Sequence, residues 1–260
     1  MTGDDARAAA RLLRAHWAAG TRLAALPDRL RPTGRADGYA IQAHLGDAAD
    51  LFGWKIAATS IAGQQHINVS GPLAGRMFAH TVIADGGAYS LSGNAFRLAE
   101  PEFAFRMAGD LPPRDTPYVV DEVLTAVATL HPAIELPDSR YDNVVEAGEA
   151  QIIADNACAH RFVLGPAMDA DWRRIDLVSL KPVARVGARY QREGVGAAVL
   201  GDPRVALAWL ANELRALGLT LRAGMVVTTG TCCAPLDLMP GDALSVDFGP
   251  LGRVSLTLTA

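Results

Sequence analysis

The sequence is poor in cysteine and has no long apolar run. It holds three cysteines in 260 residues, and two of them, Cys232 and Cys233, are adjacent. An odd number with that spacing fits neither a disulfide framework nor a zinc site, so we expect a reducing compartment. No apolar run approaches the roughly 20 residues that span a bilayer, and the first residues lack the basic and apolar stretches of a signal peptide. We therefore expect a cytoplasmic protein with no membrane partner.

The chain also lacks a concentration of positive charge. It carries 24 Lys and Arg residues against 28 Asp and Glu residues, a formal net charge of −4, and its basic residues are scattered. No basic stripe is available to neutralise a phosphate backbone, so we expect no nucleic-acid partner. Half of the residues are apolar, which is enough for a sizeable core in one large domain.

Two helical patterns occupy the first fifty residues. Residues 4–19 are rich in Ala, Leu and Arg and stop at Gly20, a residue that favours the end of a helix. A second helix is predicted from about Asp37, with three apolar residues on one stripe: Ile41, Leu45 and Ala48. Residues 1–52 are therefore expected to form a small helical N-terminal segment.

Two further helices are predicted later in the chain. A short one covers residues 121–130, where apolar side chains recur at helical spacing. The clearest covers residues 202–217: Asp202 is suited to cap its start, Pro203 fits its first turn, and Gly218 fits its end.

Strands are expected to dominate from residue 53 onward, because short apolar runs are broken there by Gly, Pro, Ser and Asn. The C-terminus predicts a hairpin, since residues 244–248 and 254–258 alternate between apolar and polar on either side of a turn at 249–252. No internal repeat or linker divides the chain. We expect an α+β fold that works as a single unit.

The most informative residues are three acids in apolar surroundings. Glu100 and Glu102 stand two apart in a predicted strand, so they share one face, while Phe103 and Phe105 cover the other. Glu135 lies in an equally apolar segment, where an unpaired carboxylate is costly to bury. Three such acids predict a site for a hard divalent metal ion. Two alternatives stay open: the pair lies on a solvated strand face, or Glu135 pairs with an arginine, Arg140.

Five blocks of the sequence, in order, resemble the 2-oxopent-4-enoate hydratase and 4-oxalocrotonate decarboxylase group of the fumarylacetoacetate hydrolase superfamily. They are Gly53-Trp-Lys-Ile-Ala-Ala-Thr-Ser60, Glu100-Pro-Glu102, Ile134-Glu-Leu-Pro-Asp-Ser-Arg140, Ala154-Asp-Asn-Ala157 with Phe162-Val-Leu-Gly165, and Pro240-Gly-Asp with Gly249-Pro-Leu-Gly252. The resemblance covers nearly the whole chain from about residue 37.

The resemblance implies a mixed β-roll or sandwich of the superfamily's C-terminal type, with residues 53–260 as the catalytic domain. It implies Mg²⁺ or Mn²⁺ held by the three acids Glu100, Glu102 and Glu135, with Lys55 as the catalytic lysine. Lys55 is either a proton shuttle or an anchor for the substrate carboxylate, and we expect burial and a neighbouring dication to favour its neutral form. The alternative for Lys55 is an ordinary surface position. The resemblance suggests four substrate-binding residues: Leu73, Asn156, Cys158 and Thr231.

The function implied is hydration of 2-hydroxypenta-2,4-dienoate, or a close analogue, to a 4-hydroxy-2-oxo acid in the catabolism of aromatic compounds. One alternative is a decarboxylase of 4-oxalocrotonate-type 2-oxo diacids. A C–C bond hydrolase of the acylpyruvate type is suggested by Thr229-Gly-Thr231, and a non-catalytic partner subunit is also considered. Cys158 stands where a small hydroxyl residue is expected, and Asn156 could instead be a turn former. By analogy with this group we expect a homo-oligomer, one that can associate with another enzyme of its pathway.

Overall fold

The computed structural model describes residues 1–168 and 171–260. Its helices are α1 (Gly3–Ala19), α2 (Arg35–Gln42), α3 (Ile61–His66), α4 (Val120–Thr125), α5 (Val144–Ala147), α6 (Glu149–Ala154) and α7 (Pro203–Ala216). Its strands are β1 (Leu51–Ala57), β2 (Leu73–Phe78), β3 (Val82–Ile83), β4 (Ala88–Ser90), β5 (Leu98–Met107), β6 (Val127–Leu136), β7 (Arg161–Leu164), β8 (Val183–Val186), β9 (Tyr190–Glu193), β10 (Val226–Thr231), β11 (Leu236–Asp237), β12 (Ala243–Asp247) and β13 (Arg253–Thr259). None of the helices described has the length and apolar character needed to cross a membrane.

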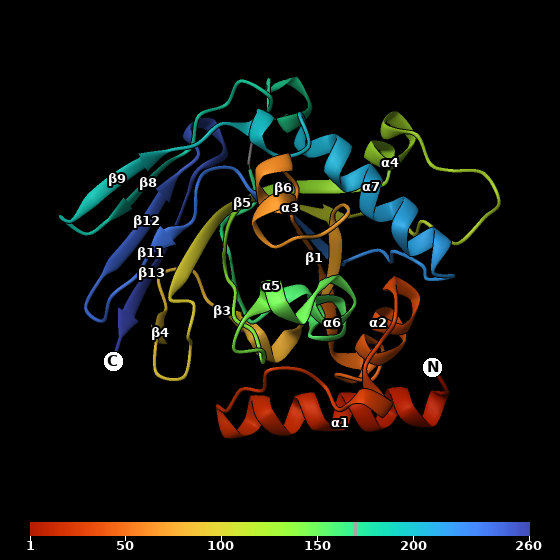
Figure 1. Ribbon diagram of the computed structural model, residues 1–260. Coiled ribbons are helices and arrows are strands. Elements are labelled where there is room, and N and C mark those ends of the chain that lie inside the picture. Colours follow the sequence, from red (N-terminus) through yellow and green to blue (C-terminus); the bar gives the residue numbers. More distant parts are fainter. Residues whose placement is uncertain (169–170) are drawn as a thin grey trace.

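The strands form two sheets. The larger has eight strands in the order β2-β1-β10-β5-β6-β7-β3, with β11 paired to β5. It is mixed, because β1 pairs with β10 and β3 with β7 in parallel, whereas β5, β6 and β7 run antiparallel. The smaller sheet has five strands in the order β4-β13-β12-β8-β9 and forms one side of the molecule (Figure 1). This arrangement confirms the expected α+β fold with mixed, curled sheets.

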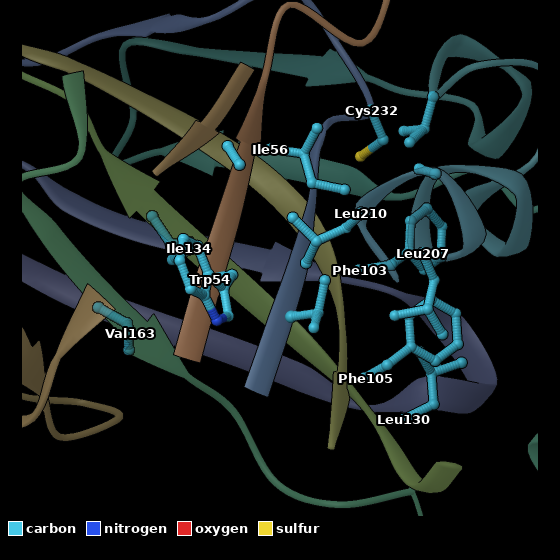
Figure 2. Packing of buried hydrophobic residues seen from close by; sticks show 14 of the residues in the cluster. Trp54, Ile56, Phe103, Phe105, Leu130, Ile134, Val163, Leu207, Leu210 and Cys232 are labelled. Atoms are coloured by element: carbon cyan, nitrogen blue, oxygen red, sulfur yellow. The ribbon is translucent and has the colours of Figure 1, made fainter. Parts of the chain in front are cut away.

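The main core lies between the two sheets and under α7. Phe103 and Phe105 are fully buried in it, and the ring of Phe103 packs edge-on against Phe248 at 5.3 Å between centroids. Figure 2 shows both rings in the same cluster as Leu207 and Leu210 of α7. The phenylalanine face of β5 is therefore the core face, as the alternating pattern predicts, and its acidic face lies on the opposite side of the sheet.

The N-terminal helices close one end of the molecule. α1 runs beneath α2, α5 and α6 (Figure 1) and buries a stripe of small residues, with Leu13, in a separate apolar cluster. The hydroxyl of Thr2 caps α1 by accepting from the N–H of Asp5, and Gly20, with a φ of 64°, ends it where predicted.

Of two other helix predictions, the one from Asp37 is too long and the one at 121–130 is partly wrong. α2 ends at Gln42 rather than continuing through Ala48, because Gly46 and Asp47 interrupt the pattern and Asp47 instead caps a single 3₁₀ turn. The helix predicted at 121–130 is wrong beyond Thr125: residues from Val127 onward form β6, whose ladder with β5 outweighs the local helical spacing.

The remaining two predictions are confirmed. The side chain of Asp202 accepts from the N–H of Arg204 at the start of α7, and Pro203 is its first residue. β12 and β13 form the predicted hairpin around a turn at Gly249–Leu251.

Candidate metal centre

The three predicted acids meet because two antiparallel strands place them in register. Glu100 of β5 lies directly opposite Glu135 of β6, and Glu102 lies two residues along on the same face of β5. One carboxylate oxygen from each of the three acids lies within 4.8 Å of the others. The sheet therefore gathers three carboxylates at one point.

Two of these carboxylates are buried with few partners, and the third, Glu100, is half-buried. Glu102 is fully buried, so the alternative of a solvated strand face is wrong for this member of the pair, and Glu135 is 1% exposed. Glu102 Oε1 and both carboxylate oxygens of Glu135 have no hydrogen-bond partner among the residues that the structure describes. Buried, unpartnered carboxylate oxygens are costly, and an all-oxygen donor set suits a hard divalent cation. The residues present thus fit Mg²⁺ or Mn²⁺.

One oxygen of the cluster has a fixed partner. The backbone N–H of Gly230 donates to Glu102 Oε2 at 2.8 Å. This bond comes from the end of β10, where Thr231 is the ladder partner of Glu102. It orients the carboxylate of Glu102 so that Oε1 is left free to face the other acids.

The surroundings of the cluster raise the pKa of two of its acids, Glu102 and Glu135. Burial raises the pKa of Glu102 to about 7, and the charge of Glu100 adds to the shift. Burial likewise raises the pKa of Glu135 well above its ordinary value, although Lys55 works against it. Charge compensation by a dication would remove both effects.

Lys55 of β1 is a cation beside this cluster. It is 2% exposed, so the alternative of a surface lysine is wrong. Its Nζ lies 3.4 Å from Glu135 Oε2 and donates to the carbonyl of Ala157 at 3.0 Å. Burial lowers the pKa of Lys55, as expected, but the carboxylates of Glu135, Glu100 and Glu102 outweigh burial and raise it above the ordinary value. In their charged form, the three acids therefore favour the ammonium form of Lys55.

The carbonyl that holds Lys55 belongs to an unusual turn, residues 156–158, called here the 156–158 turn. Asn156, Ala157 and Cys158 have φ angles of 61°, 51° and 62°, so three successive residues with a Cβ adopt the left-handed conformation. Each such residue costs about 1–2 kcal/mol. Burial also raises the pKa of the Cys158 thiol, which keeps it protonated and unsuited to nucleophilic attack.

Arg140 does not neutralise Glu135. Its guanidinium donates to Asp138 Oδ2 at 2.7 Å, and Arg22 joins the same carboxylate at 2.8 Å. The alternative in which Arg140 pairs with Glu135 is therefore wrong, and Arg140 ties a loop together.

The other predicted substrate-binding residues lie at different depths in the structure. Leu73 is fully buried at the start of β2, opposite Ala57. The hydroxyl of Thr231 donates to the carbonyl of Cys233 at 2.7 Å. A narrow cleft with room for about one water molecule, about 10 Å³, reaches Glu135, and Asn156 is among its lining residues.

Sequence reasoning missed two backbone groups of the centre, the N–H of Gly230 and the carbonyl of Ala157. Gly230 has a signal, because it lies between two threonines in a block that the sequence singles out. Ala157 has none, since any residue offers a carbonyl and its direction depends on the turn.

Comparison with known proteins places this geometry in a family, although no protein-family model matches the chain. A 2-keto-4-pentenoate hydratase 1 of Dechloromonas aromatica (strain RCB) is 33% identical over 255 residues, which is 95% of each chain. A 4-oxalocrotonate decarboxylase of Pseudomonas putida is 31% identical over 225 residues, 85% of this chain and 84% of that protein. The solved 4-oxalocrotonate decarboxylase from Pseudomonas putida G7, complexed with magnesium and adipate, superposes with a TM-score of 0.86 at 26% identity and covers 99% of this chain and 98% of that one. The chain belongs to the family of 2-keto-4-pentenoate hydratases and 4-oxalocrotonate decarboxylases.

Proposed function

We propose that this protein is a divalent-metal-dependent hydratase that acts in the catabolism of aromatic compounds. Its substrate is 2-hydroxypenta-2,4-dienoate or a close analogue, and its product is a 4-hydroxy-2-oxo acid. The observation that carries the proposal is the cluster of Glu100, Glu102 and Glu135, two of them buried, with Lys55 beside it. The hydratases among its relatives support the choice of reaction.

Glu100, Glu102 and Glu135 would hold Mg²⁺ or Mn²⁺. When bound, such an ion supplies Lewis-acid chemistry: it stabilises negative charge on the keto oxygen of a 2-oxo acid. The magnesium in the solved decarboxylase supports a hard divalent ion. Three protein carboxylates leave room for a small bidentate acid.

Lys55 is the proposed proton shuttle. Hydration requires the enol hydroxyl of the dienoate to lose a proton, C5 to gain one, and water to add its oxygen at C4 and a proton at C3. Nζ of Lys55, 3.4 Å from Glu135, would give a proton to C5 and take up the one that the enol hydroxyl loses; it would then give that proton to C3 and take one from the attacking water. The competing role is an ion pair with the substrate carboxylate.

The surroundings of Lys55 limit the access of bulk water. Lys55, Glu102 and Glu135 are each 2% exposed or less. Such enclosure strengthens every charge interaction inside the site and restricts the reaction to a small, flat substrate. Three residues are proposed to contact that substrate: Leu73, Cys158 and Thr231. The amide of Asn156, the fourth residue that the sequence suggests, is occupied by the backbone of Arg76.

A decarboxylase of 2-oxo diacids is the second candidate, favoured by the likeness to the solved 4-oxalocrotonate decarboxylase. Loss of CO₂ from such a diacid develops the same enolate charge as hydration does, so the same three carboxylates would serve. The two reactions differ in whether the distal end of the substrate carries a carboxylate.

The test is a substrate panel with purified protein and added Mg²⁺ or Mn²⁺. We expect the ultraviolet absorbance of the dienoate to fall and the product mass to rise by one water. Loss of CO₂ from a diacid, with no hydration of any monoacid, would establish the second candidate instead. No change with either metal across dienoates and diacids would exclude both.

We also propose a cytoplasmic homo-oligomer in which residues 1–52 and 53–260 form one functional unit. The unit is supported by side-chain contacts across that boundary: Gln42 Nε2 donates to the carbonyl of Ala74 at 2.8 Å, and Trp17 Nε1 donates to Asp155 Oδ1 at 3.1 Å. Light scattering on a sizing column would give the order of the oligomer.

A further inference from the structure

The 156–158 turn is a single 3₁₀ turn with left-handed φ angles, and it contacts Lys55 directly. Nζ of Lys55 donates to the carbonyl of Ala157 at 3.0 Å, and Lys55 makes no other hydrogen bond in the described part of the chain. A lysine side chain has four rotatable bonds, so a buried ammonium keeps one position only if its partners are themselves fixed. What fixes the turn therefore fixes the lysine.

Asn156 fixes the turn to the strand next to Lys55. Its Oδ1 accepts from the backbone N–H of Arg76 at 2.7 Å, and its Nδ2 donates to the backbone carbonyl of Arg76 at 2.8 Å. One side-chain amide thus binds both backbone groups of a single residue in β2. β2 is the ladder neighbour of β1, and Gly75 is the partner of Lys55.

The 156–158 turn lies close to β2. A Cβ added at Gly75 would lie 2.4 Å from the carbonyl oxygen of Asn156 and 3.0 Å from Cγ of Lys55. Asn156 is only 4% exposed, and its amide is occupied by Arg76. Its position and contacts therefore point to a role in holding the turn.

Asp155 holds the same turn from the other side. Its Oδ2 accepts from the hydroxyl of Ser139 at 2.7 Å and from the N–H of Arg140 at 2.6 Å, and its Oδ1 accepts from Trp17 of α1. Asp155 is fully buried. Three left-handed residues in a row persist only where surrounding contacts over-determine them, and these contacts supply that constraint.

We propose that Asn156 is a positioning residue: by clamping the 156–158 turn to β2, it holds the carbonyl of Ala157 against Nζ of Lys55 and so keeps the lysine beside Glu135. This proposal deepens the proposed function, because it rests on Lys55 as the group that moves the proton. It gives Asn156 a role distinct from the substrate contact that the sequence suggests.

The first experiment compares Asn156→Ala and Asn156→Gly with the parent enzyme. Both variants lose the clamp, but glycine adopts the left-handed conformation freely and alanine does not. We expect kcat to fall about 10- to 100-fold in both, with KM within about threefold, as for residues that orient a catalytic group. A rise in KM at unchanged kcat would make Asn156 a substrate ligand, and parent-like activity of Asn156→Gly would reduce its role to backbone conformation. Either result would overturn the proposal.

The second experiment reads the position of Lys55 without catalysis. The chain contains two lysines, and the other, Lys181, has a 64% exposed side chain, so it is an internal reference for acetylation followed by mass spectrometry. We measure the acetylation rate of Lys55 divided by that of Lys181. We expect this ratio to be about 10-fold higher in the Asn156 variants than in the parent. An unchanged ratio would overturn the proposal. If the parent turns over no dienoate, the proposed function fails. In that case the acetylation ratio alone tests whether Asn156 positions Lys55.

Gln42→Ala is the matched control. Gln42 is also a buried amide, 1% exposed, and it bridges the carbonyl of Ala74 in β2 to that of Ile153 without touching the turn. We expect a comparable fall in unfolding temperature but unchanged kcat and an unchanged Lys55 to Lys181 ratio. If Gln42→Ala changes both as much as Asn156→Ala does, general loosening explains the effect and the proposal is wrong.

Discussion

Glu100 and Glu135 are direct cross-strand partners in the ladder between β5 and β6, so the two carboxylates are brought together by strand register. A register shift of one residue would turn every side chain of one strand to the other face of the sheet. The pairing of the two strands therefore fixes the position of the acids. The apolar residues between the acids favour that pairing.

Glu102→Gln should weaken metal binding and abolish turnover while leaving the fold intact. The amide keeps the size of the side chain but removes a charged ligand, whose loss exceeds the roughly 10- to 100-fold effect of changing an outer-shell group. Calorimetric titration with Mn²⁺ and the dienoate assay measure the two effects. Glu193→Gln, a change of an exposed acid on β9, is the control. An unchanged rate in Glu102→Gln would refute its assignment as a ligand.

Lys55→Met should separate chemistry from metal binding. Removing a cation beside the acids leaves metal affinity unchanged or tighter, whereas kcat falls about 10²- to 10⁴-fold if Lys55 is a general acid–base group. Lys181→Met, the other lysine of the chain, serves as the control. If KM rises and kcat does not change, Lys55 is an anchor for the substrate carboxylate.

The metal-free protein should lose stability as pH rises from about 4.5 to about 7. The native pKa of Glu102 is about 7 and its ordinary value is 4.5, so across this window the native state keeps a proton that the unfolded state releases. The free energy of unfolding in EDTA should fall by on the order of 2 kcal/mol. Urea unfolding at several pH values measures it. The slope should shrink in Glu102→Gln and with saturating Mg²⁺, and a flat profile in EDTA would contradict the assignment.

Gly230→Ala should damage the metal centre through the backbone. Gly230 has a φ of +91°, and an added Cβ would lie 2.1 Å from Thr59 Oγ1, so the strand end must move and its N–H leaves Glu102. We expect a loss of about 1–3 kcal/mol in stability, as for other overpacked sites, with weaker metal binding. Gly224→Ala is matched, because its φ of +82° is also positive but no atom lies within 4 Å of the added Cβ. Metal affinity should be retained in that control.

Trp17→Phe should test whether α1 supports the centre. The change keeps most of the ring but removes the indole N–H that donates to Asp155 Oδ1 at 3.1 Å, at a stability loss of about 1 kcal/mol. Burial already raises the pKa of Asp155 to about 6, and loss of a donor to its charged form should raise it further. The unfolding midpoint and kcat are the readouts, with Trp209→Phe in α7 as the comparison. Equal effects of the two changes would argue against a link between α1 and the site.

Local patterns predicted much of the fold because their physical causes are local. α7 follows from a capping aspartate, a proline in the first turn and a glycine that fits its end, and the C-terminal hairpin follows from alternation around a glycine-rich turn. The helix predicted at 121–130 failed for the opposite reason. Residues from Val127 onward are compatible with either state locally, and their pairing with β5 decides between the two.

The sequence by itself determined which acids could share a strand face, which side of that strand is apolar, and which family the ordered blocks resemble. Only the tertiary structure decided that Glu135 lies opposite Glu100, that Arg140 pairs with Asp138, and that the carbonyl of Ala157 and the N–H of Gly230 reach Lys55 and Glu102. The reason is physical: alternation along a strand is a property of neighbouring residues, whereas register and the direction of a backbone group depend on segments far apart in the chain.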